Sequence, residues 1–418
     1  MERGKAKGVR GALAYFVSWQ SSPENKRALS IIHYSLFIAT EVIFILMWGI
    51  ILIVAVALLG AGFVYLTVCF SRFGFIKKLA GEVSVKRRLF GLLCIAAIMA
   101  ALTITLGVVN AAICIVNLLL FFIIADIVGL IIRKAAKKER KHYFEGYAAL
   151  LAAVIYLCIG FYLANGVWEK DYSLKTDKDI GQLKIIQFAD SHVGTTFDGE
   201  GLNKYIDEMN ELDPDIVVIT GDFVDDDTDR ENMIAASAAV GRLKTKYGVY
   251  YCFGNHDKGY YDNSRRGYNS DDLVAELEKN GVTVLEDESV LVDNRFYVVG
   301  RADKSEELEG RSGYRKPIDE LMQGLDKDKY TIVLDHQPND YDAESKANAD
   351  LVLSGHTHGG QMLPINRIGE WIGANDYTYG YKRIGSTDFI VTSGISDWAI
   401  DFKTGCRSEY VVIDVSEN

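Results

Sequence analysis

The stretch LSGHTHGGQ, residues 353–361, places His356 and His358 two positions apart between glycines, in a chain of 418 residues with only seven histidines. The apolar run ADLVL, which reaches into it, predicts a strand, and alternate residues of an extended segment point the same way. Glycines here permit a sharp turn and a close approach of a ligand to the backbone. The motif therefore indicates a metal site. A pair of surface histidines in a polar turn is the alternative.

Charge divides the chain into two regions. Residues 1–167 carry 18 Lys and Arg against 7 Asp and Glu, a net charge of +11. Residues 168–418 carry 27 against 49, a net charge of −22. We predict a basic N-terminal segment, a transmembrane helical domain, a linker and a globular domain, with bounds 1–30, 31–167, 168–182 and 183–418.

The N-terminal region contains long apolar stretches. The first covers 44 residues between Arg27 and Arg72, with Glu41 as its only formal charge. One span needs about 20 residues, so this stretch is expected to form a helical hairpin. Three more apolar stretches cover roughly 89–110, 111–132 and 147–165. We therefore predict five membrane spans, with four as the alternative. A removable signal peptide is excluded because its apolar core would be far shorter.

Basic loops predict the orientation of the spans. Loops 71–88 and 133–142 carry a strong excess of Lys and Arg, and such loops stay in the cytoplasm. The segment 147–165 then runs outward. We expect a multi-pass protein of the cell membrane whose residues after about 168 lie outside the cytoplasm.

The charged residues in the apolar stretches and the cysteines give little information about function. Asp126 and Glu41 are functional candidates because charges inside a membrane are costly, and the alternative is that they face a helix interface or a span end. A disulfide between Cys252 and Cys406 has no support from the sequence. The absence of a CxxC pair excludes a thiolate zinc site of that type.

From residue 183 onwards, short apolar runs alternate with amphipathic stretches, a pattern typical of an α/β domain. Each run ends at a polar corner, and ligands of α/β sheets bind at the carboxyl ends of strands. The predicted helices are 200–211, 231–245 and 271–280. The runs are LKIIQF before Asp190, DIVVIT before Asp222, VYYCF before Asn255, YTIVL before His336 and DLVLS before His356.

Five of the seven histidines lie at these corners. They are His192, His256, His336, His356 and His358. Together with Asp190, Asp222 and Asn255 they offer nitrogen and oxygen donors, which suit Mn, Fe or Zn better than an all-oxygen calcium site. Five such corners in order exclude the surface-turn interpretation of the opening motif.

These corners resemble a known family. The segments ADSHVG (189–194), GDFVD (221–225), GNHD (254–257), DHQP (335–338) and GHTHGGQ (355–361) are similar to the five sequence blocks of the calcineurin-like metallophosphoesterases. The membrane spans before them resemble the membrane-anchored bacterial members. The resemblance covers essentially all of 183–418 and implies a four-layer α/β/β/α sandwich around two mixed sheets. Ser191 and Asp257 depart from the usual blocks, which more often have a hydrophobic residue and a glutamate there.

The resemblance also implies a set of ligands for two divalent ions. Asp190, His192 and His358 would bind one ion, Asn255, His336 and His356 the other, and Asp222 both. A carboxylate right after Gly221 can approach two ions about 3.5–4 Å apart, and a water shared by the ions becomes the nucleophile. His256 is left over, so we expect it to donate a proton to the leaving oxygen or to stabilise the transition state. Asp257 would fix its tautomer.

Other polar groups are weaker candidates. Asp335 precedes His336, but neighbouring residues of a strand face opposite ways. The acidic run 225–227 is expected to be a solvated loop rather than a further metal site. The segments 258–270 and 374–383 are rich in tyrosine and are candidate substrate contacts, with plain exposed loops as the alternative.

The sequence therefore predicts a membrane-anchored dinuclear phosphoesterase that hydrolyses a phosphomonoester, phosphodiester or pyrophosphate bond. Its expected partners are the lipid bilayer and a phosphorylated small molecule or a lipid or envelope substrate. The net charge of −22 argues against nucleic acid, because no basic track is present to neutralise phosphates. The alternative is a non-catalytic metal-bound receptor or interaction domain on a transporter-like membrane part. The complete ligand set and the additional His256 argue against that alternative.

Overall fold

The computed structural model describes residues 56–137, 139, 142–260, 264–308 and 310–418. The predicted basic segment 1–30 and most of the first predicted hairpin, including Glu41, lie outside the described residues. The chain forms two compact units, and each is described by itself. Their bounds are Met1–Ile98 with Phe122–Gly146, and Met99–Phe121 with Tyr147–Asn418.

Apolar helices form the N-terminal part of the described chain. They are Val56–Phe70, α3 (Gly74–Ala80), α4 (Ser84–Ala136) and α5 (Phe144–Asn165). Two of them, α4 and α5, are long and apolar enough to cross a membrane, and a third span results if the bent pair Val56–Phe70 and α3 forms one crossing. Two or three candidate spans are therefore present among the described residues, fewer than the five predicted.

Helix α4 accounts for one span of this difference. The predicted spans 89–110 and 111–132 are joined in this one helix of 53 residues, because neither proline nor a polar loop separates them. Gly107 interrupts the helix with φ 80° and ψ 169°. Glycine adopts a positive φ without steric cost, so a break is tolerated here.

Asp126 lies in the first unit and connects two of its helices. Its carboxylate pairs with Arg72 at 2.7 Å and accepts a hydrogen bond from the Tyr65 hydroxyl at 3.0 Å. This arrangement matches the interpretation of Asp126 as a helix-interface residue.

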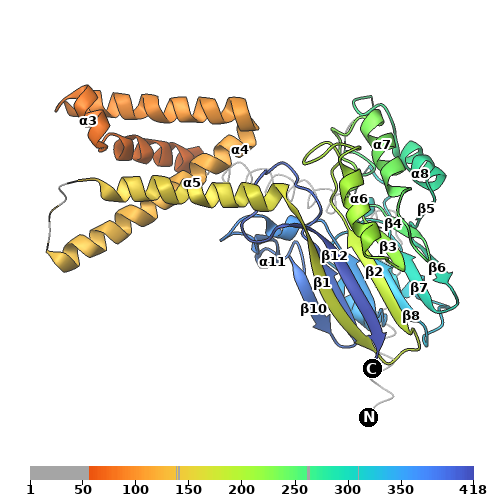
Figure 1. Ribbon diagram of the computed structural model, residues 1–418. Coiled ribbons are helices and arrows are strands. Elements are labelled where there is room, and N and C mark those ends of the chain that lie inside the picture. The colour runs from red at the N-terminus through yellow and green to blue at the C-terminus, as the bar shows by residue number, and fades with distance from the viewer. Residues whose placement is uncertain (1–55, 138, 140–141, 261–263, 309) are drawn as a thin grey trace, which may run out of the picture. The chain divides into compact units, whose positions relative to one another are not determined.

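The second unit contains an α/β domain with two mixed six-stranded sheets (Figure 1). The first sheet has the order β1 (Val167–Thr176), β12 (Ser408–Glu417), β2 (Gln182–Phe188), β3 (Ile216–Thr220), β4 (Val249–Cys252) and β5 (Val282–Val284). The second has the order β10 (Gly380–Ile384), β11 (Thr387–Val391), β9 (Leu351–Ser354), β8 (Tyr330–Leu334), β7 (Phe296–Gly300) and β6 (Glu288–Val292).

Both faces of the central strands are buried, which explains their continuous apolar runs. Ile185 of β2 and Ile332 of β8 belong to the core between the sheets. Their neighbours Ile186 and Val333 point the other way, into two outer cores beneath the helices. The helices on the first sheet are α6 (Leu202–Glu211), α7 (Arg230–Val240) and α8 (Ser270–Lys279), close to their predicted positions. The short helices are η1 (Lys304–Glu307), α9 (Ile318–Leu321), α10 (Tyr341–Lys346), η2 (His358–Gly360) and α11 (Ile368–Trp371).

The prediction of a linker over 168–182 is wrong. Strand β1 occupies most of this segment and pairs in parallel with β12. Leu174 is the one buried residue of β1, because the strand lies at the edge of its sheet. An edge strand of this kind carries no apolar run that would mark it in the sequence.

Candidate metal centre

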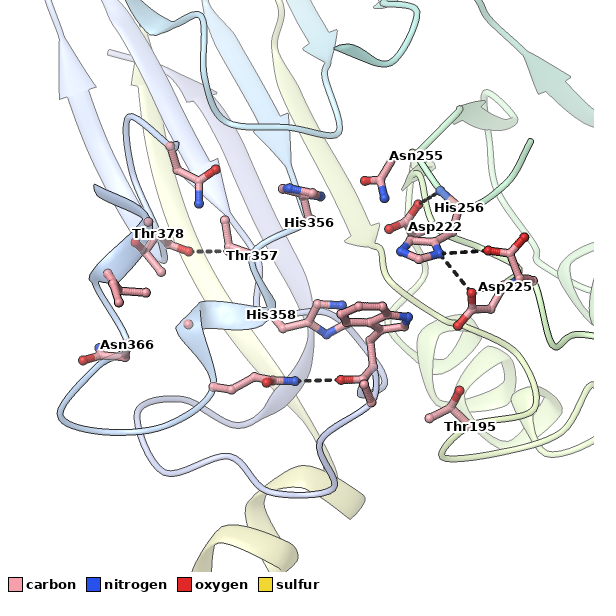
Figure 2. Close-up of a pocket in the computed structure, with 18 of the residues that line it drawn as sticks. Thr195, Asp222, Asp225, Asn255, His256, His356, Thr357, His358, Asn366 and Thr378 are labelled. Atoms are coloured by element: carbon pink, nitrogen blue, oxygen red, sulfur yellow. Dashed lines mark hydrogen bonds and ion pairs between the residues drawn. The ribbon is translucent and has the colours of Figure 1, made fainter. Parts of the chain in front are cut away.

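The predicted ligand residues follow the carboxyl ends of five strands and converge in two groups. In each group the donor atoms lie within 4.8 Å of one another. Cluster 1 consists of Asp190, His192 and His358, and cluster 2 of Asp222, His336 and His356. Asn255 faces cluster 2, with its Oδ1 3.2 Å from His336 Nε2 (Figure 2).

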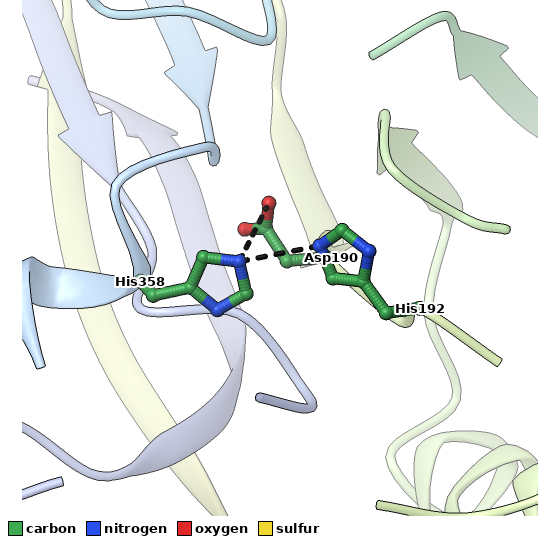
Figure 3. Close-up of side chains that lie close together, drawn as sticks. All are labelled: Asp190, His192 and His358. Carbon is green, nitrogen blue, oxygen red and sulfur yellow. Dashed lines mark hydrogen bonds and ion pairs between the residues drawn. The ribbon is translucent and has the colours of Figure 1, made fainter. Parts of the chain in front are cut away.

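Cluster 1 directs three donor atoms toward one point (Figure 3). The Nε2 atoms of His192 and His358 are 3.2 Å apart, and His358 Nε2 is 3.8 Å from Asp190 Oδ1. Burial lowers the pKa of His358 well below its usual value, so this imidazole is neutral near pH 7. Nitrogen lone pairs and a carboxylate at such distances fit a bound cation, which would satisfy all three.

The donor atoms of cluster 2 also fit a bound cation. His336 Nδ1 lies 2.8 Å from the carbonyl oxygen of Thr220, so it donates there and leaves Nε2 as the free donor atom for a metal. That Nε2 is 3.1 Å from Asp222 Oδ2. Burial alone would lower the pKa of His336, but Asp222 and Asp190 raise it well above its usual value. A divalent ion would take the place of the proton that these carboxylates attract.

The carboxylate of Asp222 lies between the two clusters. Its Oδ2 is 3.7 Å from His192 Nε2 of cluster 1, in addition to its contact with His336. Its Oδ1 accepts a hydrogen bond from the His256 backbone N–H at 2.8 Å. The carboxylate is therefore held in place and faces donor atoms of both clusters.

Two glycines allow this placement. A Cβ on Gly221, which has φ +80°, would lie 2.5 Å from the Gly254 nitrogen and 2.7 Å from His336 Nδ1. A Cβ on Gly254 would lie 2.2 Å from Asp222 Oδ1. Any larger residue at either position would push apart the ends of β3 and β4.

The segment LSGHTHGGQ (353–361) was predicted to continue the strand as far as the two histidines, and the structure differs. Strand β9 ends at Ser354, and His356 and His358 have φ values of 69° and 47°. These left-handed conformations, which are rare outside glycine, send the two rings into different clusters. Asp190, His192 and Asp222 also have positive φ, so strained backbone is concentrated in the site.

His256 lies outside both clusters but lines the same cleft. Its Nδ1 is 2.9 Å from Asp225 Oδ1, and Asp225 Oδ2 is 3.6 Å from His192 Nδ1. One carboxylate thus lies beside two imidazoles. Burial alone would lower the pKa of His256, but Asp225 and Asp222 raise it overall.

The acidic run 225–227 is therefore not simply a solvated loop. The side chains of Asp225 and Asp226 are mostly buried, and Asp226 accepts a hydrogen bond from the Tyr260 backbone N–H at 2.8 Å. Asp227 alone matches the expectation, with 76% of its side chain exposed. Asp225 is not among the predicted site residues, although it is the last residue of the segment GDFVD.

Asp257 does not fix the tautomer of His256, and that prediction is wrong. Its fully buried carboxylate accepts four backbone N–H groups, at 2.7–3.1 Å. The donors are Asp222, Phe223, Val224 and Gly254. Asp257 thus ties the loop after β3 to the end of β4, and Asp225 takes the position beside His256.

Neighbouring polar groups have structural roles. Asp335 points away from the clusters and pairs with Arg301 at 2.9 Å and with Arg315, as strand alternation predicts.

No disulfide joins Cys252 and Cys406, because both are free thiols.

The clusters open into a cleft of about 880 Å³, which has room for a phosphoryl group and a sizeable organic group. From the two tyrosine-rich segments, the described lining residues are Tyr260, Asn375 and Thr378. Trp398, which no sequence motif indicated, also lines the cleft. Its ring centroid is 5.2 Å from that of His256.

Comparison with known proteins agrees with this geometry. Residues 183–360 match the family model of the calcineurin-like phosphoesterases. A metallophosphoesterase of Helicobacter pylori strain J99 is 31% identical over 269 residues, which cover 61% of this chain and 69% of the relative. The chain belongs to the calcineurin-like metallophosphoesterase family. It is accordingly a metal-dependent phosphoesterase hydrolase.

Other metallophosphoesterases extend the comparison. YkuE of Bacillus subtilis strain 168 is 30% identical over 297 residues, which cover 66% of this chain and 97% of YkuE. A transmembrane protein with a metallophosphoesterase domain from Bos taurus is 28% identical over 242 residues, covering 55% of this chain and 52% of the relative. Together with the apolar helices α4 and α5, the latter similarity supports association with a membrane.

The structural role of Asp257 is testable in this metallophosphoesterase. Asp257→Asn should lower the free energy of unfolding by about 3 kcal/mol or more, because hydrogen bonds to a charged group contribute about 1.5–3 kcal/mol each. The denaturant midpoint measures this change. Asp227→Asn, at an exposed position, is the control and should leave the midpoint nearly unchanged. A normal midpoint combined with lost activity would instead assign Asp257 to catalysis.

Proposed function

We propose that this metallophosphoesterase binds two divalent ions and hydrolyses a phosphomonoester, phosphodiester or pyrophosphate bond at the outer face of the cytoplasmic membrane. The observation that carries the proposal is the position of Asp222. Its carboxylate faces His192 of cluster 1 and His336 of cluster 2 at 3.7 and 3.1 Å. A carboxylate that faces donor atoms of both clusters is what two neighbouring cations require.

The donor sets define which residues would hold each ion. Asp190, His192 and His358 would bind one, Asn255, His336 and His356 the other, and Asp222 both. Nitrogen and oxygen donors without thiolates favour Mn, Fe or Zn. Such ions would lower the pKa of a shared water toward neutrality and neutralise charge on the phosphoryl oxygens.

The chain itself supplies the group for the leaving oxygen. His256 binds no ion in this scheme, lines the cleft and has its Nδ1 held by Asp225, so its Nε2 is available to a substrate. We assign it the donation of a proton to the leaving oxygen. A non-catalytic receptor domain, the alternative function, would have no use for an imidazole positioned in this way.

The helices support a topology with the catalytic domain outside the cytoplasm. The break at Gly107 divides α4 into arms of about 35 and 44 Å at 1.5 Å per residue, and each can cross a hydrocarbon core of about 30 Å. With α5 and a hairpin in the first apolar stretch, five spans result. Asp401 of the catalytic domain donates its backbone N–H to Asn110 Oδ1 at 2.9 Å, near the break. The break and the catalytic domain therefore belong on one side, opposite the basic loops 71–88 and 133–142.

Cysteine labelling tests the orientation. Ser289→Cys, at an exposed position of β6, should react with a membrane-impermeant thiol reagent on intact cells. Lys86→Cys, exposed in the first turn of α4 at the end expected to lie inside, is the matched control and should react only after lysis. The wild type gives the background from its native cysteines. The reverse labelling pattern would invert the topology.

Elemental analysis of the purified protein tests the two-ion proposal. The wild type should contain two divalent ions per chain. Asp222→Asn should lower the occupancy of both sites, whereas His358→Ala should empty mainly one. His142→Ala, outside the clusters, serves as the control and should retain both ions. A single ion in the wild type that Asp222→Asn leaves unchanged would contradict the proposal.

Kinetics of His256→Ala separate catalysis from metal binding. The variant should keep both ions and turn over about 10²–10⁴-fold more slowly, which is the usual contribution of a general acid. The loss should be smaller for a nitrophenyl ester, because a good leaving group departs without a proton. An equal loss for all leaving groups would indicate electrostatic stabilisation instead. Loss of metal would place His256 among the ligands.

A further inference from the structure

Large apolar side chains are exposed beside the mouth of the metal cleft. They are Leu363, Ile365, Ile368, Trp371 and Ile372, with exposed fractions from 48% to 73%. We call these five residues the apolar rim. Ile368 also lines the cleft, together with Gln361, Asn366 and Gly369 of the same segment. Clustered exposure of this kind marks a surface that contacts a membrane, a ligand or another protein.

The segment that carries the apolar rim has no unpaired charge. Arg367 and Glu370 are the charged residues between Gln361 and Ala374, and they pair with each other at 2.8 Å. Glu370 also accepts the Thr378 backbone N–H at 3.0 Å. The charges of this segment are therefore satisfied within the protein.

The same segment is attached to apolar helix α5, within one compact unit. The Tyr156 hydroxyl donates to the carbonyl oxygen of Leu363 at 2.8 Å and lies 2.6 Å from Thr404 Oγ1. Next to Leu363, Met362 packs in an apolar cluster with Cys114 of α4. The first residue of the rim thus lies directly against a helix that can cross a membrane.

One face of α5 makes a series of such contacts. Tyr156, Gly160 and Ala164 are four residues apart, and the last two accept hydrogen bonds from Lys403 N–H at 3.0 Å and Ser408 Oγ at 2.7 Å. Tyr156 precedes the end of α5 at Asn165 by about 14 Å of helix. With α5 as a span in the proposed topology, the segment beside Tyr156 would lie within the hydrocarbon layer.

We propose that the apolar rim enters the outer leaflet and that the cleft acts on a phosphoester of an amphiphile whose acyl chains remain in that leaflet. The substrate part of this proposal rests on the proposed function. Ile368 connects the rim to the cleft, and Trp398, 44% exposed beside His256, extends the apolar path toward the site. Water adds to phosphorus as the bond to the leaving oxygen breaks, and that oxygen takes a proton, so no further reactant is needed.

A photo-cross-linking experiment tests the rim without reference to activity. The full chain, reconstituted in phosphatidylcholine vesicles, carries p-benzoylphenylalanine at position 372 or, as the control, at position 308. Leu308 is 56% exposed, as is Ile365, but lies outside the rim. After irradiation, mass spectrometry should find lipid adducts at position 372 and essentially none at 308. Equal adduct levels at the two positions would overturn the insertion of the rim.

Activity of the same reconstituted protein with Mn²⁺ tests the substrate class. The lipid probes are phosphatidic acid and phosphatidylglycerol in the vesicles, and the soluble probes are p-nitrophenyl phosphate and bis(p-nitrophenyl) phosphate. Ile365→Ser with Ile372→Ser should lower lipid turnover about tenfold or more, since apolar contacts hold the rim in the interface. Soluble turnover should stay within about twofold, because neither residue lines the cleft. Leu308→Ser should change neither.

The outcomes separate this inference from the proposed function. Wild-type hydrolysis of a soluble probe without hydrolysis of either lipid would overturn the amphiphile as substrate and leave the phosphoesterase intact. Equal losses on lipid and soluble probes in the rim variant would overturn the role of the rim. Failure of the wild type on all four probes would count against the proposed function and against the substrate class with it, while the cross-linking result would still decide whether the rim enters the bilayer.

Discussion

The buried carboxylate of Asp222 is the constraint on which the site depends. Burial acts to raise its pKa, but the imidazoles of His336 and His192 lower it overall, so the group stays charged. A buried anion is stable only beside compensating positive charge and hydrogen-bond donors. The turn at Gly221, the close approach of Gly254 and the N–H of His256 all hold this carboxylate between the clusters.

Because the ligands come from both sheets, metal binding and folding are connected. Cluster 1 takes Asp190 and His192 from the end of β2 and His358 from beyond β9. Cluster 2 likewise combines Asp222 of the first sheet with histidines of the second. Ions in both clusters would join the two sheets at the edge where their strands end, so metal binding would add to the stability of the fold. The strained left-handed residues fit this view, since bound metal would stabilise conformations that the backbone alone disfavours.

The loops around the cleft also join the site to the apolar helices. The segment around Leu363 and the segment 398–405 both border the cleft, and both contact α4 or α5 through Tyr156 or Asn110. The buried ammonium of Lys403 strengthens this connection, because it pairs with Asp397 at 3.2 Å and donates to the carbonyl of Ser393. A change in the packing of α5 would therefore displace two short loops that border the cleft.

The sequence by itself determined the membrane character of the N-terminal region, the strands β2, β3, β4, β8 and β9, and the polar residues that follow them. Strands buried on both faces produce uninterrupted apolar runs, and metal donors at their ends are rare enough to stand out. Strand β1 was not predicted, because an edge strand has polar residues at its exposed positions.

Only the tertiary structure decided which carboxylate lies beside which histidine ring. Asp257 is next to His256 in the chain, yet its side chain turns into the backbone of the β3 loop, and Asp225, 31 positions earlier, lies beside the ring instead. The attachment of Tyr156 to Leu363 was equally invisible, since 207 positions separate them. Such pairings depend on left-handed turns and on the approach of distant loops, and local sequence patterns contain no information about either.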